Sequence, residues 1–313
     1  MSRTLRTALV LVLVLAAGGA IWGLAGGSAT RQATADSAGP HGGEIEKGEL
    51  ARYLNATEAA ATSSSKAELV AEGRRLFRSS AVALDGESCQ ACHTDGGANN
   101  KLGVITHPRF DGDFSGPRDP PALWGVGRTA PYGWAGDSAT LNAMAIKTVR
   151  SHFKASVSNN DDTATVGALS AKLVAYMEQL EPPRSAFDDG TLTAQQLRGE
   201  KLFQGKAGCI ACHTGVLFTD NRIHDTGVSQ ATTTSNDPGA PPPPVPPGTQ
   251  PTPGPFINTP QMRDLKSSAP YMHNGTEATL KDVVTFYNSR SLVSPLRLTT
   301  PEIDDLVAFL EGL

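Results

Sequence analysis

Apolar side chains recur at helical spacing in three stretches of this chain. In the clearest of them, a start signal at Thr300-Pro301-Glu302 precedes an i, i+3, i+4, i+7 apolar stripe. The stripe consists of Ile303, Leu306, Val307 and Leu310. Residues 67–77 and 194–203 form two further amphipathic stretches. No segment shows sustained alternation of apolar and polar residues, so the pattern predicts an all-α fold.

A continuous apolar run of a different kind occupies residues 8–27, shortly after Arg3 and Arg6. Positive charge followed by an apolar core is typical of a secretory signal, and residues 33–35 offer a small-residue cleavage site. The run is also about long enough to span a bilayer, which needs ~20 apolar residues. We therefore expect residues 1–27 to be a signal peptide or an N-terminal membrane anchor. Residues 28–63 are rich in Ala, Ser, Thr and Gly, which is typical of a flexible linker.

All four cysteines of the chain lie in two Cys-x-x-Cys-His motifs. The motifs comprise Cys89, Cys92 and His93 in the first half, and Cys209, Cys212 and His213 in the second. In such a motif the two thiols form thioether bonds to haem, and the histidine becomes the proximal ligand of the iron. A zinc site or a thioredoxin-like dithiol also uses paired cysteines, but neither needs a histidine after both pairs. The motifs therefore predict two covalently bound haem c groups, which bacteria attach in the periplasm.

The surroundings of the two haem motifs repeat in the same order. A Gly-x-x-Leu-Phe sequence precedes each motif, an Ala-Pro-Tyr sequence follows it, and a similar apolar stretch ends each half. Repeats at this level determine the architecture before individual elements are assigned. We therefore predict two tandem cytochrome c-type haem domains, at residues 64–182 and 193–313, joined by a linker at 183–192. A proline-rich insertion at 236–255 should form an extended surface loop of the second domain.

The charge pattern excludes one class of partner. The formal net charge is -4 at pH 7, from 27 basic and 31 acidic residues, and the basic residues form no cluster. Nucleic-acid-binding domains carry such clusters, so we expect no nucleic-acid partner.

Several motifs of the second half resemble those of a known family. Residues 218–228, 259–263 and 269–288 resemble the bacterial di-haem cytochrome c peroxidase/MauG family, and the resemblance covers nearly all of residues 67–313. It implies a periplasmic oxidoreductase that reduces H2O2 to water with electrons from a small donor protein, a cytochrome c or a cupredoxin. In this family the first haem is peroxidatic and the second transfers electrons. The resemblance also admits MauG-like oxidation of a protein substrate.

The resemblance implies further residues around each haem. It makes Trp134 the residue that couples the two haems. It makes His107 a distal ligand that can leave the first iron. In the absence of the family's glutamate, His107 and His152 are the candidates for catalytic proton transfer. For the second iron it favours Tyr287 as sixth ligand, while Met272 stays an alternative because thioether ligation is usual in cytochromes c. Arg263 is implied as the partner of a haem propionate.

The family also holds Ca²⁺ between its domains, and the matching positions here are Asp119, Ser268 and Pro270. Their oxygen atoms suit this hard ion. One departure from the family concerns proton transfer, because residues 150–154 contain no counterpart of the family's glutamate. This departure keeps a third alternative open, a non-enzymatic di-haem electron carrier. A homodimer and a membrane tether through the N-terminal helix also stay open.

Overall fold

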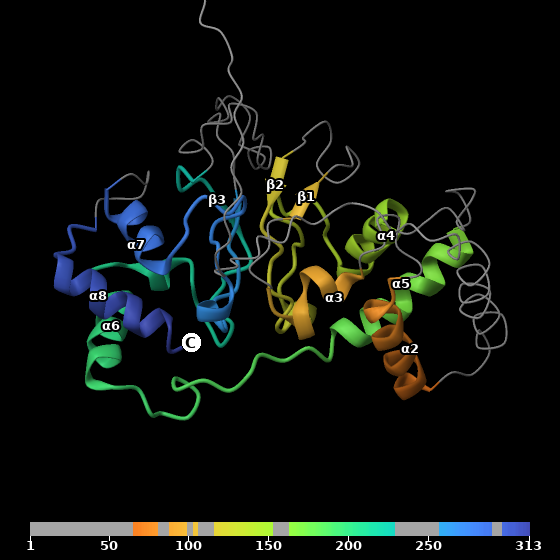
Figure 1. The fold of residues 1–313 in the computed structure, drawn as a ribbon, viewed down its shortest axis with the longest axis horizontal. Coiled ribbons are helices and arrows are strands. Elements are labelled where there is room, and N and C mark those ends of the chain that lie inside the picture. Colours follow the sequence, from red (N-terminus) through yellow and green to blue (C-terminus); the bar gives the residue numbers. More distant parts are fainter. Residues whose placement is uncertain are drawn as a thin grey trace, which may run out of the picture. The chain divides into compact units, whose positions relative to one another are not determined.

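Figure 1 shows a computed structural model of the chain. The structure describes residues 65–80, 88–98, 103–105, 116–152, 163–228, 257–289 and 296–313, all within the unit His41–Leu313. The predicted N-terminal signal or anchor, the linker at 28–63, the proline-rich insertion and His107 lie outside these residues. None of the helices in the described ranges is long and apolar enough to cross a membrane.

Two helices pack against each other in the first half. They are α2 (Lys66–Arg78) and α5 (Thr163–Met177). A capping box starts α2, where the Ser65 hydroxyl accepts from the Glu68 N–H and the Glu68 carboxylate accepts from the Ser65 N–H. The helices cross at Gly73, where a Cβ would lie only 1.9 Å from the Lys172 carbonyl oxygen, so the crossing requires glycine. The surrounding core consists of Leu76, Phe77, Val149, Val166, Leu169, Leu173, Tyr176 and Leu180.

The second half repeats this helix crossing. Its helices are α6 (Ala194–Gln204) and α8 (Thr300–Leu310). A Cβ on Gly199 would lie 2.0 Å from the Asp305 carbonyl oxygen, so glycine is again required. Phe203 and Phe309 meet edge to face beside the crossing, with ring centroids 5.3 Å apart. In the first half Phe77 and Tyr176 also meet edge to face, with ring centroids 5.3 Å apart. The same close approach of the backbones and the same kind of aromatic contact thus hold both helix pairs together.

Side chains fix where α6 and α8 begin. The Thr193 hydroxyl accepts from the Gln196 N–H at the start of α6, and the Gln196 side chain accepts from the Thr193 N–H. Pro301 lies in the first turn of α8, and Glu302 accepts from the Thr299 N–H. The three helices predicted from apolar spacing are thus confirmed.

A further helix in each half follows an Ala-Pro-Tyr turn, at residues 130–138 and 269–277. These helices are α4 (Leu141–His152) and α7 (Leu280–Ser289). In each turn the tyrosine bonds through its backbone to a later residue, Tyr132 to Ser138 and Tyr271 to Glu277. The Ala-Pro peptide bond is cis in both turns.

Short strands and single helical turns complete the described residues. Strand β1 (Gly103–Ile105) pairs antiparallel with β2 (Gly116–Arg118), and β3 (Ile223–His224) pairs antiparallel with β4 (Ile257–Asn258). The helical turns are α3 (Cys89–Cys92), η1 (Thr94–Gly96), η2 (Val126–Arg128), η3 (Cys209–Ala211) and η4 (Leu265–Ser267). The all-α prediction is therefore correct only in its coarser form, a helix-rich chain with few strands. Strands this short contain too few residues to show alternation.

Equivalent backbone contacts tie each haem-motif half to its own C-terminal end. The Gly125 N–H donates to the Leu180 carbonyl at 2.6 Å, and the Asp264 N–H donates to the Leu313 carbonyl at 3.2 Å. Gly125 and Asp264 both have a positive φ, 63° and 56°. The two halves therefore share a backbone path as well as a sequence pattern.

Residues 183–192, predicted as a linker, pack against the second half. The Phe187 N–H donates to the Gly312 carbonyl at 3.1 Å. The Phe187 ring meets Phe218 and Phe309 edge to face, with centroids 5.2 and 6.2 Å away. This segment therefore contributes to the core of the second half.

Candidate haem-binding sites

Each haem motif forms a helical turn that brings its cysteines and histidine together. The His93 N–H donates to the Cys89 carbonyl at 2.8 Å, and the His213 N–H donates to the Cys209 carbonyl at 2.9 Å. All four cysteines are only partly exposed. Because residues three apart on a helical turn are neighbours, each pair presents its thiols on one side. This arrangement suits two thioether bonds to one macrocycle.

A backbone carbonyl orients each motif histidine. His93 Nδ1 lies 3.0 Å from the Pro121 carbonyl oxygen, and His213 Nδ1 lies 2.9 Å from the Phe218 carbonyl oxygen. A carbonyl only accepts, so Nδ1 carries the proton and Nε2 keeps its lone pair for a metal. Burial lowers the pKa of His213 and keeps its ring neutral, which is the form that binds iron. Both histidines therefore fit the role of a proximal haem ligand.

The cysteine pairs lack the properties of the alternatives. Burial raises the pKa of Cys209 to about 11 and also raises that of Cys212, whereas a reactive dithiol needs a thiolate near neutral pH. Within the described residues, one group of three or more side chains could hold a metal ion, Cys212, Asp220 and His224. That group contains a single cysteine, so the two pairs do not converge on a four-thiolate zinc site.

Tyr287 of α7 lies beside the second haem motif. Burial, and to a lesser degree Cys209 and Cys212, raise its pKa, while a hydrogen bond with Thr226 acts in the opposite direction. Met272 is half-buried in the second Ala-Pro-Tyr turn, where its φ is 70°. The Tyr287 hydroxyl therefore lies close enough to both cysteines of the second motif for them to affect its pKa.

Trp134 lies where the two halves meet. Its Nε1–H donates to the Asp119 carbonyl at 2.9 Å, and its own carbonyl accepts from the Asn258 N–H at 2.8 Å. Its ring meets the His273 ring edge to face, with centroids 6.3 Å apart. His273 occupies the same place in the second Ala-Pro-Tyr turn that Trp134 occupies in the first. Comparison of the two repeats could have identified His273, which lies in a stretch that resembles the family but was given no role there.

Asp119 is a buried carboxylate next to this junction. It is 6% exposed, its N–H donates to the His273 carbonyl at 3.1 Å, and burial raises its pKa from 3.8 to about 8. Asn258 occupies the corresponding place in the second half, where its Nδ2 donates to the Pro131 carbonyl at 2.7 Å. The Asp119 carboxylate, when ionised, cannot donate such a hydrogen bond. Its buried negative charge therefore requires a proton or a cation nearby.

The other two residues predicted for calcium lie in or next to the second Ala-Pro-Tyr turn. The Ser268 N–H donates to the Leu265 carbonyl at 3.0 Å, and Pro270 directly precedes Tyr271. Burial raises the pKa of Tyr271 to about 12, and Asp119 is among the smaller causes. Asp119 is therefore near this turn, so the three predicted oxygen donors occupy one region.

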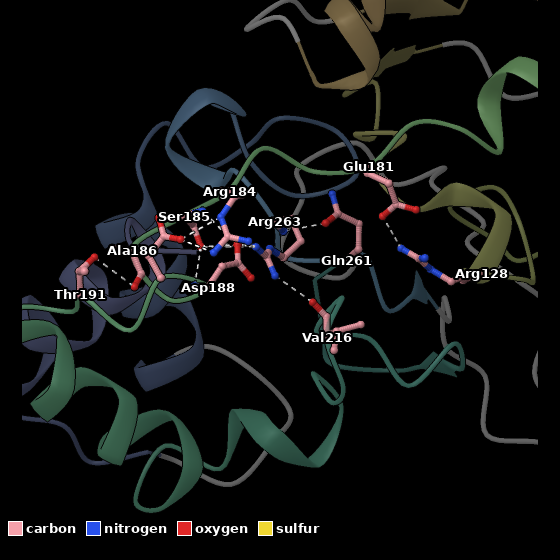
Figure 2. A network of polar contacts seen from close by, with 11 residues as sticks. Arg128, Glu181, Arg184, Ser185, Ala186, Asp188, Thr191, Val216, Gln261 and Arg263 are labelled. Carbon is pink, nitrogen blue, oxygen red and sulfur yellow. Dashed lines mark hydrogen bonds and ion pairs between the residues drawn. The ribbon is translucent and has the colours of Figure 1, made fainter.

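Figure 2 shows Arg263 within a network of polar contacts. Its guanidinium is 4% exposed and donates to the Val216 carbonyl at 3.0 Å, to the Ser185 hydroxyl at 3.3 Å and to the Asp188 carboxylate. Burial acts to raise the pKa of Asp188, but hydrogen bonds from Arg263 and Ser185 bring it below its usual range. The Nε of Arg263 is buried without a partner, so one donor remains for the predicted propionate. Ser185 and Asp188 come from the predicted linker, which is why no local motif pointed to them.

Comparisons with known proteins agree with these features. No protein-family model matches the chain. It is 34% identical over 182 residues to the cytochrome-c peroxidase IdrP2 of Pseudomonas sp. strain SCT, which covers 48% of this chain and 49% of that protein. It is 28% identical over 293 residues to the methylamine utilization protein MauG of Methylorubrum extorquens, which covers 79% of this chain and 78% of that protein.

A solved structure supports the fold. The chain resembles the diheme peroxidase BthA of Burkholderia thailandensis with a TM-score of 0.56 at 21% identity, over 79% of this chain and 86% of that one. The chain spans no more than about half the length of several cytochrome-c peroxidase relatives that it matches, 41–49%.

Proposed function

Since this chain belongs to the bacterial di-haem cytochrome c peroxidase/MauG family, we propose that it is a periplasmic di-haem peroxidase. It reduces H2O2 to two molecules of water, with two protons and with two electrons from a small cytochrome c or cupredoxin. One observation carries the proposal: both Cys-x-x-Cys-His motifs hold a histidine whose Nδ1 is bonded to a backbone carbonyl. The presence of the same histidine–carbonyl contact in both halves supports two tandem cytochrome c-type haem domains.

The residues around the second motif serve electron entry. Haem c, when bound at both motifs, supplies the irons that accept and pass on electrons. Cys209, Cys212 and His213 would hold the electron-transfer group, and Tyr287 of α7 would be the candidate for the further ligand of its iron. At the meeting point of the halves, the aromatic contact of Trp134 with His273 provides the electronic coupling between the two sites.

The residues around the first motif serve peroxide reduction. Cys89, Cys92 and His93 hold the peroxidatic group from the proximal side. Residues 150–154 contain no carboxylate, so proton transfer between the peroxide oxygens falls to His107. When haem c is bound at the first motif, His107 would also be a candidate ligand of its iron.

A calcium ion between Asp119 and the carbonyls of Ser268 and Pro270 completes the proposal. The buried Asp119 carboxylate supports it, because burial alone favours the protonated form. A divalent cation replaces that proton and keeps the carboxylate ionised. The ion then stabilises the region where Trp134 donates to the Asp119 carbonyl.

A steady-state assay tests the proposed function. The holoprotein, as isolated and after half-reduction, is mixed with a reduced small cytochrome c and H2O2, and donor oxidation is followed optically. Donor oxidation should depend on peroxide and should be lost in His93→Ala, in which the second haem motif is intact. Absence of donor oxidation in both forms of the parent protein rejects the proposal.

MauG-like oxidation of a protein substrate is the second candidate, favoured by the position of Tyr287 beside the second motif. A phenolate ligand stabilises ferric iron, which suits the storage of oxidising equivalents. Tyr287→Phe should then change the low-spin ferric spectrum of the second haem and raise its reduction potential. An unchanged spectrum excludes tyrosine ligation and removes the basis for this candidate.

A further inference from the structure

Trp124 carries a buried donor that none of the described residues uses. Its Nε1–H is shielded from solvent and has no hydrogen-bond partner among the residues that the structure describes. The indole packs on Gly96 and Gly97, which follow closely after His93. A Cβ on Gly96 would lie 2.7 Å from the indole Cζ3, and Gly96 has a φ of 98°, so only glycine lets the ring approach so closely. Leaving a buried N–H unbonded is costly, so this donor points to a ligand.

Backbone contacts identify Trp124 as the counterpart of Arg263 in the second half. The residue before each donates its N–H to a carbonyl just after the haem motif. These pairs are Leu123 with Gly96 at 2.6 Å and Met262 with Leu217 at 3.0 Å. The residue after each has a positive φ and bonds to the C-terminal end of its half, as described for Gly125 and Asp264. Trp124 and Arg263 therefore occupy the same place in the repeated fold.

Each counterpart keeps one unused buried donor, Nε1 of Trp124 and Nε of Arg263. Both residues also lie close to a motif histidine, because a proline three positions earlier lies beside that histidine. The Pro121 carbonyl oxygen is 3.0 Å from His93 Nδ1, and the backbone of Pro260 is among the smaller causes that act on the pKa of His213. Two different side chains thus offer an N–H at the same place beside two equivalent motifs. A ligand common to both halves explains this better than two separate packing defects.

We propose that Trp124 Nε1–H donates a hydrogen bond to a propionate of the first haem. This inference rests on the proposed function, because it requires haem c on the Cys89–Cys92 motif. The chemistry matches, since indole nitrogen only donates and a propionate carboxylate only accepts. Reduction adds an electron beside this carboxylate, so a nearby donor favours the ferrous state. Trp124 is therefore a positioning residue that also sets the redox balance of the first haem.

Indole NMR of the 15N-labelled holoprotein tests the contact in the parent chain. The chain has three tryptophans, so the Trp124 signal is identified by its loss in Trp124→Phe. In the ferric protein this signal should show a paramagnetic shift, and its N–H should exchange slowly with solvent. A signal without a paramagnetic shift, or with rapid exchange, overturns the inference.

Spectroelectrochemical titration of each haem gives a second readout. Trp124→Phe keeps an aromatic ring against Gly96 and Gly97 but removes the donor. The ferric–ferrous equilibrium of the first haem should move several-fold toward ferric, while that of the second haem stays unchanged. Trp134→Phe is the matched control, because its N–H already has a protein acceptor, the Asp119 carbonyl. Trp134→Phe should have the same ferric–ferrous equilibrium of the first haem as the parent protein.

An unmoved first haem in Trp124→Phe, or an equal shift in both variants, contradicts the inference. The outcome is independent of peroxidase activity. A shift without peroxide turnover supports the inference while the proposed function fails. Turnover without a shift leaves the proposed function standing and overturns the inference.

Discussion

The pH dependence of stability should reveal the buried carboxylate of Asp119. Burial raises its pKa from 3.8 to about 8 in the folded protein, whereas the unfolded chain titrates near the ordinary value. Between these values the folded protein keeps a proton that the unfolded chain has lost, so stability falls as pH rises. At 1.36 kcal/mol per pKa unit, the loss between pH 4 and pH 8 reaches about 6 kcal/mol as an upper limit.

Calcium should cancel this loss. The ion binds the ionised carboxylate of the folded protein and not the unfolded chain, so it stabilises by mass action. Cation-free protein in EDTA should therefore become less stable from about pH 5 to about pH 8, and added Ca²⁺ should restore stability mainly at the upper end. Urea unfolding followed by circular dichroism measures both effects.

Asp119→Asn provides the decisive comparison. An amide at this place can donate a hydrogen bond as Asn258 does to the Pro131 carbonyl, and it carries no charge. In EDTA at about pH 8 the variant should be the more stable protein by several kcal/mol, whereas in Ca²⁺ the parent should gain and the variant should not. The matched variant Asn258→Asp should acquire the pH dependence that Asp119→Asn loses. The reasoning is refuted if the free energy of unfolding of the parent in EDTA does not change between about pH 5 and about pH 8 and equals that of Asp119→Asn.

Three further substitutions test the fold and the junction. Gly199→Ala forces a methyl group against the Asp305 carbonyl, so urea unfolding should show a loss of about 1–3 kcal/mol or more. Gly167→Ala on α5 is its control: nothing lies within 4 Å of the added Cβ, and a gain of about 0.5–1 kcal/mol is expected. Thr299→Ala removes the capping hydroxyl of α8 and should cost about 1 kcal/mol, while serine at this position should retain most of it. Trp134→Leu removes the aromatic contact with His273, so stopped-flow reduction of the first haem through the second should slow; an unchanged rate contradicts the coupling role.

The parts of the structure that depend on local sequence could be predicted. The start of α8 at Thr300 follows from the Thr-Pro-Glu start signal, and the haem motifs follow from the spacing of cysteine and histidine. The glycines at both helix crossings also stand at equivalent places in the repeat, although the sequence alone did not show what they approach. Their role became clear only from the distance to the opposing carbonyl groups.

The parts of the structure that depend on contacts between distant residues could not be predicted from the sequence. The ion pair of Arg263 with Asp188 joins residues 75 positions apart, and Asp188 lies in a segment that has the composition of a linker. The strand pairs are two or three residues long, so no period can be measured in them. The unused donor of Trp124 is visible only when every neighbour of its indole nitrogen is known. In each case the cause is packing between segments, which no local pattern encodes.

The central claim is that the two haems differ: the iron at His93 can open to an added ligand, whereas the iron at His213 is saturated. Low-temperature EPR of the ferric and half-reduced holoprotein, recorded before and after addition of cyanide, tests this most directly. We expect cyanide to change the ferric signal of the His93 haem in at least the half-reduced form, and to leave the ferric signal of the His213 haem as it was. Ferric signals that cyanide leaves unchanged in both forms would contradict the claim and favour an electron carrier.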